Sequence, residues 1–119
     1  MTAMIWCPFP DRESARQIAN ILLDEKLIAC ANLVGPMESI FDWDGKRDSG
    51  KEFGVLFKTD ADQLDQAVDR LAELHPYDIP AIMGWRCDSA PEETRNWLQS
   101  LSQEYIREWF GRAAKLQDY

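Results

Sequence analysis

The single histidine and the three cysteines are the residues of this chain best suited to bind a metal ion. A neutral imidazole at His75 is a good ligand for copper or zinc, and thiolates at Cys7 and Cys30 suit copper in its soft, reduced state. Cys7 and Cys30 lie in apolar segments that could be neighbouring strands. We therefore take His75, Cys30 and Cys7 as candidate metal ligands, ahead of Cys87.

Each candidate also has a purely structural interpretation. A histidine at the end of a helix can bond the last carbonyl groups, and a buried free cysteine usually behaves as a small apolar side chain. Glu38, Asp42 and Asp44 could add oxygen ligands or form a solvated strand edge. The sequence leaves these alternatives open, but a lone histidine excludes a histidine pair or a Ser-His-Asp triad within one chain.

The elements that position these residues follow from apolar spacing, helix caps and breakers. Asp44-Gly45 predicts a two-residue hairpin turn, with 46–51 as a loose hairpin end, and Gly35-Pro36 is expected to end the second apolar run. The third helix is expected as one long helix or two consecutive ones. Strands are expected at 3–7, 27–33, 37–43, 52–59 and 82–87, and helices at about 11–26, 59–75 and 89–114.

This order predicts an α+β fold of the ferredoxin-like, split βαβ type, with an additional C-terminal helix. We expect one domain over residues 1–119, with a frayed tail at 115–119. The helices of such a fold cover one face of an antiparallel sheet, and aromatic residues on the strands exceed what one buried face needs. Either the C-terminal helix or a second copy of the chain could cover the other face.

The amino-acid composition argues against two classes of binding partner. The 119 residues carry a formal net charge of −8, which argues against nucleic acid and against anionic membranes. Three cysteines without a Cys-x-x-Cys pair argue against a disulfide framework, and we find neither a signal peptide nor a membrane-spanning run. We therefore expect a cytoplasmic protein.

Several segments, in order and with consistent spacing, resemble the CutA divalent-ion tolerance family. They are LIACAN at 27–32, SIFDWDGK at 39–46, Lys58-Thr59, LHPYDIP at 74–80 and Trp97-Leu98. The resemblance implies a homotrimer and a role in tolerance or binding of divalent cations, Cu²⁺ above all. It also implies a likeness to the PII signalling trimers. Trp43, Tyr77 and Trp97 could line a cleft between subunits, because pockets favour aromatic walls, or they could simply pack in the trimer interface.

The chain departs from the family pattern at two positions that bear on the site. Ala81 stands where the family usually has glutamate, and Thr94 stands where it usually has tyrosine. We predict a non-catalytic homotrimer in divalent-cation tolerance, with a PII-like signalling or small-ligand module as the alternative. An acylphosphatase-type enzyme is disfavoured, because Pro8 and Pro10 remove two backbone donors from the loop that would hold phosphate. An RNA-binding sheet is disfavoured by the lack of basic surface.

Overall fold

The computed structural model describes residues 1–117, with the side chains of 108 and 112–117 left out. These described residues form four strands, three α-helices and one short 3₁₀ helix. In chain order they are β1 (Thr2–Phe9), α1 (Arg12–Asp24), β2 (Cys30–Trp43), β3 (Lys46–Asp60), η1 (Ala61–Gln63), α2 (Leu64–Leu74), β4 (Met83–Arg86) and α3 (Glu92–Gln117).

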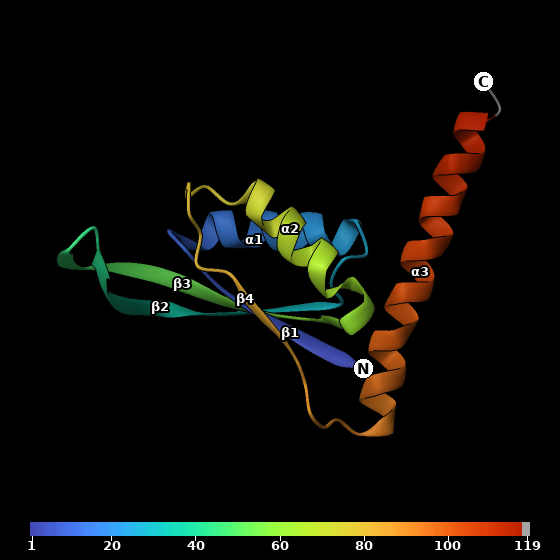
Figure 1. Ribbon diagram of the computed structural model, residues 1–119, viewed down its shortest axis with the longest axis horizontal. Coiled ribbons are helices and arrows are strands. Elements are labelled where there is room, and N and C mark those ends of the chain that lie inside the picture. The colour runs from blue at the N-terminus through green and yellow to red at the C-terminus, as the bar shows by residue number, and fades with distance from the viewer. Residues whose placement is uncertain (118–119) are drawn as a thin grey trace.

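The strands form a single antiparallel sheet in the order β2-β3-β1-β4. Helices α1 and α2 lie together on one face, and α3 stands at the end of the sheet where β1 begins (Figure 1). This confirms the predicted α+β fold with its additional C-terminal helix. The strand order is the one that two interleaved βαβ halves produce.

The core lies between the sheet and the two helices. Alternate residues of β1, namely Ile5, Cys7 and Phe9, face Val55 and Phe57 of β3, and all five are fully buried. The apolar stripes predicted for the first two helices close this layer. Its helical members include Ala15, Ile18, Ala19, Leu22, Leu64, Ala67 and Leu71.

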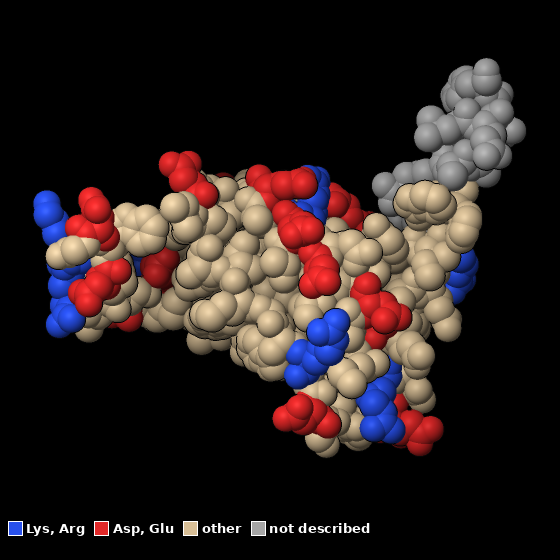
Figure 2. All heavy atoms as spheres, in the orientation of Figure 1, with Lys and Arg blue, Asp and Glu red and all other residues tan. Residues whose placement is uncertain are grey.

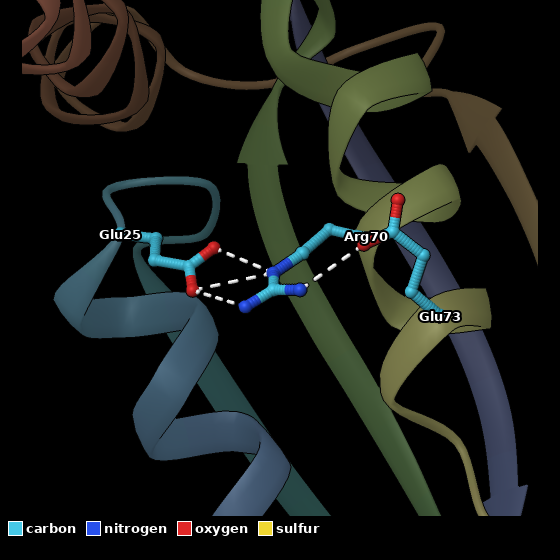
Figure 3. Close-up of polar contacts among 3 residues, drawn as sticks. All are labelled: Glu25, Arg70 and Glu73. Carbon is cyan, nitrogen blue, oxygen red and sulfur yellow. Dashed lines mark hydrogen bonds and ion pairs between the residues drawn. The ribbon is translucent and has the colours of Figure 1, made fainter.

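Polar contacts fix how the two helices begin and how they lie together. Asp11 caps α1, because its carboxylate accepts the backbone N–H of Ser14 at 2.7 Å. That bond holds the pKa of Asp11 below its ordinary value. Arg70 of α2 donates to both carboxylate oxygens of Glu25, just beyond α1, and to Glu73 one turn away (Figure 3). The guanidinium therefore joins the two helices side by side.

The hairpin is longer and more regular than predicted. β2 and β3 stay paired up to Trp43 and Lys46, so residues 46–51 are strand rather than a loose end, and Asp44-Gly45 alone makes the turn. A two-pronged pair between Arg47 and Asp42, with bonds of 2.8 and 3.1 Å, supports the tip. Charged side chains gather at this tip, at the left of Figure 2.

Two other expected boundaries were wrong for local reasons. Gly35-Pro36 does not end β2, because the chain bulges there between Val34 and Met37 and the pairing with β3 resumes. Thr59 does not open α2, because it stays in β3 with its hydroxyl donating to the Leu27 carbonyl at 2.8 Å.

The third helix is continuous. α3 runs unbroken from Glu92 to Gln117, so 115–117 of the predicted frayed tail are helical, while 118 and 119 lie outside the described residues. Among its described side chains Leu98, Leu101 and Ser102 are buried, and α3 contacts β1 and β3. Within the described chain the sheet face opposite α1 and α2 therefore keeps large exposed side chains, as at Met83 and Trp85.

We expect Gly54→Ala to be destabilising, because Gly54 makes room for the indole of Trp6 on that open face. A Cβ built at Gly54 would lie 2.1 Å from Cη2 of Trp6, so the ring must move. We expect a loss of about 1–3 kcal/mol in the free energy of unfolding, measured by urea denaturation. Gly50→Ala, in the same strand with open space around it, is the control, and equal losses would contradict this account.

Candidate functional site

A groove of about 730 Å³ lies between the hairpin arm, formed by the paired ends of β2 and β3 around Asp44-Gly45, and the loop that follows α2. Its walls are mainly apolar, with a few polar groups at the rim, which is the usual character of a small-molecule pocket. Residues lining it include Phe41 and Trp43 from β2, Lys51 and Glu52 from β3, and Tyr77, Ile79 and Ala81 from the loop.

Tyr77 connects the two walls of the groove. Its hydroxyl donates to the Glu52 carboxylate at 2.9 Å, across 25 positions of the sequence. Partial burial, followed by that carboxylate, raises the pKa of Tyr77 to about 12. The phenol therefore stays protonated at neutral pH and remains a donor to Glu52. The arm and the loop are held together by a contact that physiological pH does not remove.

His75, at the end of α2, holds the loop that follows it in place. Its Nε2 lies 2.8 Å from the carbonyl oxygen of Pro8, and its Nδ1 accepts the backbone N–H of Tyr77 at 3.1 Å. With Nδ1 as the acceptor, Nε2 is the ring nitrogen that donates to the Pro8 carbonyl. The ring also stacks on Phe9 at 4.7 Å and is only 7% exposed. Since both ring nitrogens are bonded to backbone groups, His75 holds no free lone pair for a metal.

The two cysteine candidates lie on opposite faces of the sheet. Cys7 pairs with Val55 and points into the core, whereas Cys30 pairs with Lys58 and points to the open face. Burial, and then the charge of Glu52, raises the pKa of Cys7 to about 12, so its thiol is protonated at neutral pH. Cys30 is half-buried.

The predicted ligands His75, Cys30 and Cys7 are thus not brought together. Among the side chains that the structure describes, no three His, Cys, Asp or Glu residues converge on a point where they could share an ion. Ala81, which stands where the family usually has glutamate, lines the groove. The described side chains of one chain therefore do not form a metal site with three or more such donors.

A single chain does not test the predicted cleft between subunits, which stays a prediction. Within this chain Trp43 and Tyr77 line the groove, whereas Trp97 borders a separate pocket with Leu23 and Ile28. Sequence reasoning did not single out Glu52 or Ile79 for this site. The contact between Tyr77 and Glu52 depends on how the loop after His75 bends, and no local sequence pattern predicts that bend.

The burial of Cys7 predicts that its thiol reacts more slowly than those of Cys30 and Cys87. With a disulfide-exchange reagent near pH 8, the half-buried Cys30 and Cys87 should react in the native protein and Cys7 only after unfolding. Because the folded-state pKa of Cys7 is raised from 9.0 to about 12, the neutral thiol contributes stability below pH 9 that is lost as pH rises toward 12. Three thiols reacting equally fast in native protein would contradict this placement.

Taken together, the sheet order, the long hairpin arm and the groove beside it define a small α+β protein of the split βαβ class with a ligand-sized intramolecular groove. Residues 3–101 match the family described as CutA1 divalent ion tolerance protein. Since that match covers more than half of the sequence, the chain belongs to the CutA1 divalent ion tolerance protein family.

Individual relatives agree with this assignment. The Divalent-cation tolerance protein CutA of Pyrococcus horikoshii is 41% identical over 95 residues, which cover 80% of this chain and 92% of that protein. The solved structure of the periplasmic divalent cation tolerance protein CutA of Archaeoglobus fulgidus has a TM-score of 0.80 at 31% identity, covering 85% of this chain and 98% of that one. CutA1 of Ehrlichia chaffeensis gives 0.79 at 31% identity, covering 84% and 94%.

The compartment is not uniform among these relatives. One is named periplasmic, and the similar protein of Arabidopsis thaliana is named chloroplastic. Within residues 1–117, no helix combines the length and the apolar character needed to cross a membrane. A cytoplasmic location for this chain stays a prediction.

Proposed function

We propose that this chain is the subunit of a non-catalytic homotrimer that takes part in divalent-cation tolerance. Membership of the CutA1 family over residues 3–101 carries the proposal. The names of the similar proteins describe tolerance to divalent cations, and the shared fold extends over more than four fifths of the chain. Cytoplasm is the compartment that we propose with it.

The uncovered face of the sheet supports self-association. Alternation along β1 and β4 puts Met4, Trp6, Met83 and Trp85 on the face opposite the helices, and α3 does not reach across it. Exposed apolar area of this extent on a sheet usually marks an interface, and most soluble oligomers are made of identical chains in closed symmetry. A trimer would use this surface without a further partner.

Copper binding belongs to the proposal, in a form that the geometry restricts. The ring of His75 is bonded to backbone groups, and Cys7 is buried in the core. Of the three predicted ligands, Cys30 is therefore the accessible one, because it is half-buried on the sheet face opposite α1 and α2. Among the described side chains, a site with three or more His, Cys, Asp or Glu donors then requires residues from a second copy. The cation would therefore bind between subunits, and its affinity would depend on assembly.

One experiment tests assembly and copper together. Light scattering should give a mass that is a multiple of three 13.7 kDa chains, and anaerobic calorimetry with Cu²⁺ should show binding that Cys30→Ser weakens at least tenfold. Cys87→Ser, a change at another half-buried free thiol, is the matched control. A clean monomer or dimer would refute the trimer, and equal isotherms for the two variants would remove Cys30 as a ligand.

The groove supports the alternative of a PII-like small-ligand module. Its volume of about 730 Å³ and its aromatic wall at Phe41 and Trp43 suit a small organic molecule. A thermal-shift screen of metabolites, with and without Cu²⁺, separates the two functions, because a ligand that binds only the native state raises the melting temperature. A metabolite that stabilises the protein without copper favours the alternative.

A further inference from the structure

A pocket of about 290 Å³ lies where α3 passes the end of α1 and the side of α2. It shares no lining residue with the groove beside the hairpin arm. Tyr105 and Trp109 of α3 line it, and both lie beyond residue 101, where the match to the CutA1 family ends. The family therefore does not supply a role for this pocket.

The part of the pocket that α3 contributes is aromatic. Tyr105 and Trp109 are four residues apart, so they lie on the same side of the helix. Tyr105 is half-buried and packs against the core, which fixes the position of this wall. Trp109 is still 56% exposed although it lines the pocket, so its indole has surface left for a ligand. The buried side chain of Leu27 adds a further apolar contact.

The part that α1 and α2 contribute is acidic. Three carboxylates and one guanidinium line it, which leaves a formal net charge of −2, and they belong to Glu25, Asp69, Glu73 and Arg70. Arg70 donates to Glu25 through bonds of 2.8, 2.9 and 3.2 Å and to Glu73 through one of 3.0 Å (Figure 3). Its charge is therefore already paired, and an anionic ligand would meet no unpaired cation here.

Some carboxylate oxygens remain available to a cationic ligand. Among the described side chains no ion pair involves Asp69, and Glu73 bonds Arg70 through Oε2 alone. Yet no three His, Cys, Asp or Glu side chains of this part of the chain converge closely enough to share a metal ion. The pocket therefore suits a larger cation whose charge is spread, rather than a hard ion that needs several oxygens at short range.

We propose that this pocket binds a small organic cation of the alkylated ammonium class. The faces of Trp and Tyr rings attract such cations, because the ring quadrupole is negative at the face, and the neighbouring carboxylates attract the same charge at longer range. The volume lies at the low end for small-molecule pockets, which span about 300–1,000 Å³. The site is separate from the sheet face that we propose for the trimer, so the two proposals stand independently.

Calorimetry on the full-length chain with choline tests the charge of the ligand. The matched control is the uncharged analogue of choline in which carbon replaces the nitrogen, because it keeps the shape and removes the charge. We expect choline to bind at least tenfold more tightly than this alcohol, and we expect added salt to weaken choline binding. Equal affinities, or no binding of choline at millimolar concentration, would overturn the proposal.

Three variants test the residues. Trp109→Leu should weaken choline binding about fivefold to tenfold, and Asp69→Asn about twofold to threefold. Phe110→Leu is the matched control, because Phe110 is an exposed aromatic residue next to Trp109 that does not line the pocket. Circular dichroism checks the fold of each variant. Equal effects of Trp109→Leu and Phe110→Leu would contradict the assignment.

Competition with a metal ion separates this site from the proposed function in divalent-cation tolerance. Mg²⁺ at the same concentration as choline should leave most of the choline bound, because the pocket offers no close set of oxygens. Complete displacement by Mg²⁺ would make the pocket a metal site and overturn the proposal. Light scattering should give the same mass for Trp109→Leu as for the wild type, so a failure of choline to bind leaves the trimer proposal untouched.

Discussion

Replacing His75 by alanine should reduce the free energy of unfolding by about 2–4 kcal/mol and loosen the groove. The substitution leaves the Pro8 carbonyl and the Tyr77 N–H without their partners, which lie 2.8 and 3.1 Å from the ring nitrogens. It also empties the space between Phe9 and Tyr77, whose rings lie within 5 Å of the imidazole. Urea denaturation measures the loss.

Two further variants separate this role from a general effect on the loop. Asp78→Ala changes an exposed residue of the same loop and should cost little. His75→Gln should cost less than His75→Ala, because its amide nitrogen reaches about as far as Nε2 and can still donate to the Pro8 carbonyl. If His75→Ala were as stable as the wild type, the ring would not be holding the loop, and its availability as a metal ligand would reopen.

The fold was predictable where sequence pattern and burial coincide. Ala15, Ile18, Ala19 and Leu22 repeat at helical spacing, and each is buried against the sheet. The hairpin turn at Asp44-Gly45 was predictable because both residues adopt positive φ. The strand at 46–51 was missed because its residues are polar, and an exposed hairpin arm is held by backbone pairing rather than by an apolar alternation.

The candidate site was less predictable because it depends on which way side chains point. Cys7 and Cys30 both lie in apolar strands, as expected, but β3 separates those strands and the two positions differ in phase, so the thiols face opposite sides. His75 was placed correctly at the end of α2. Its ring bonds the Pro8 carbonyl, 67 positions earlier in the chain, and no local pattern encodes that contact. Trp97 was expected in a cleft between subunits; within one chain it borders a pocket separate from the groove, so that expectation stays a prediction.

Asp60→Ala should weaken the attachment of α3 and cost about 2–3 kcal/mol in the free energy of unfolding. Asp60 ends β3 with a carboxylate that is only 2% exposed, and it accepts the hydroxyl of Ser102 from α3. It also lies 3.5 Å from the nitrogen of Met1. Removing the carboxylate leaves the buried Ser102 hydroxyl without its acceptor and opens a cavity where the helix meets the sheet.

A double-mutant cycle with Ser102→Ala isolates this contact. Ser102→Ala alone should cost about 1 kcal/mol. The double variant should cost less than the two single losses combined, because it no longer has the Ser102 hydroxyl that Asp60→Ala alone leaves without an acceptor. Asp69→Ala, at an exposed carboxylate of α2, is the matched control. Strict additivity would show that the two side chains act independently. In that case apolar contacts such as those of Leu98, Leu101 and Tyr105 would fix the direction in which α3 leaves the sheet.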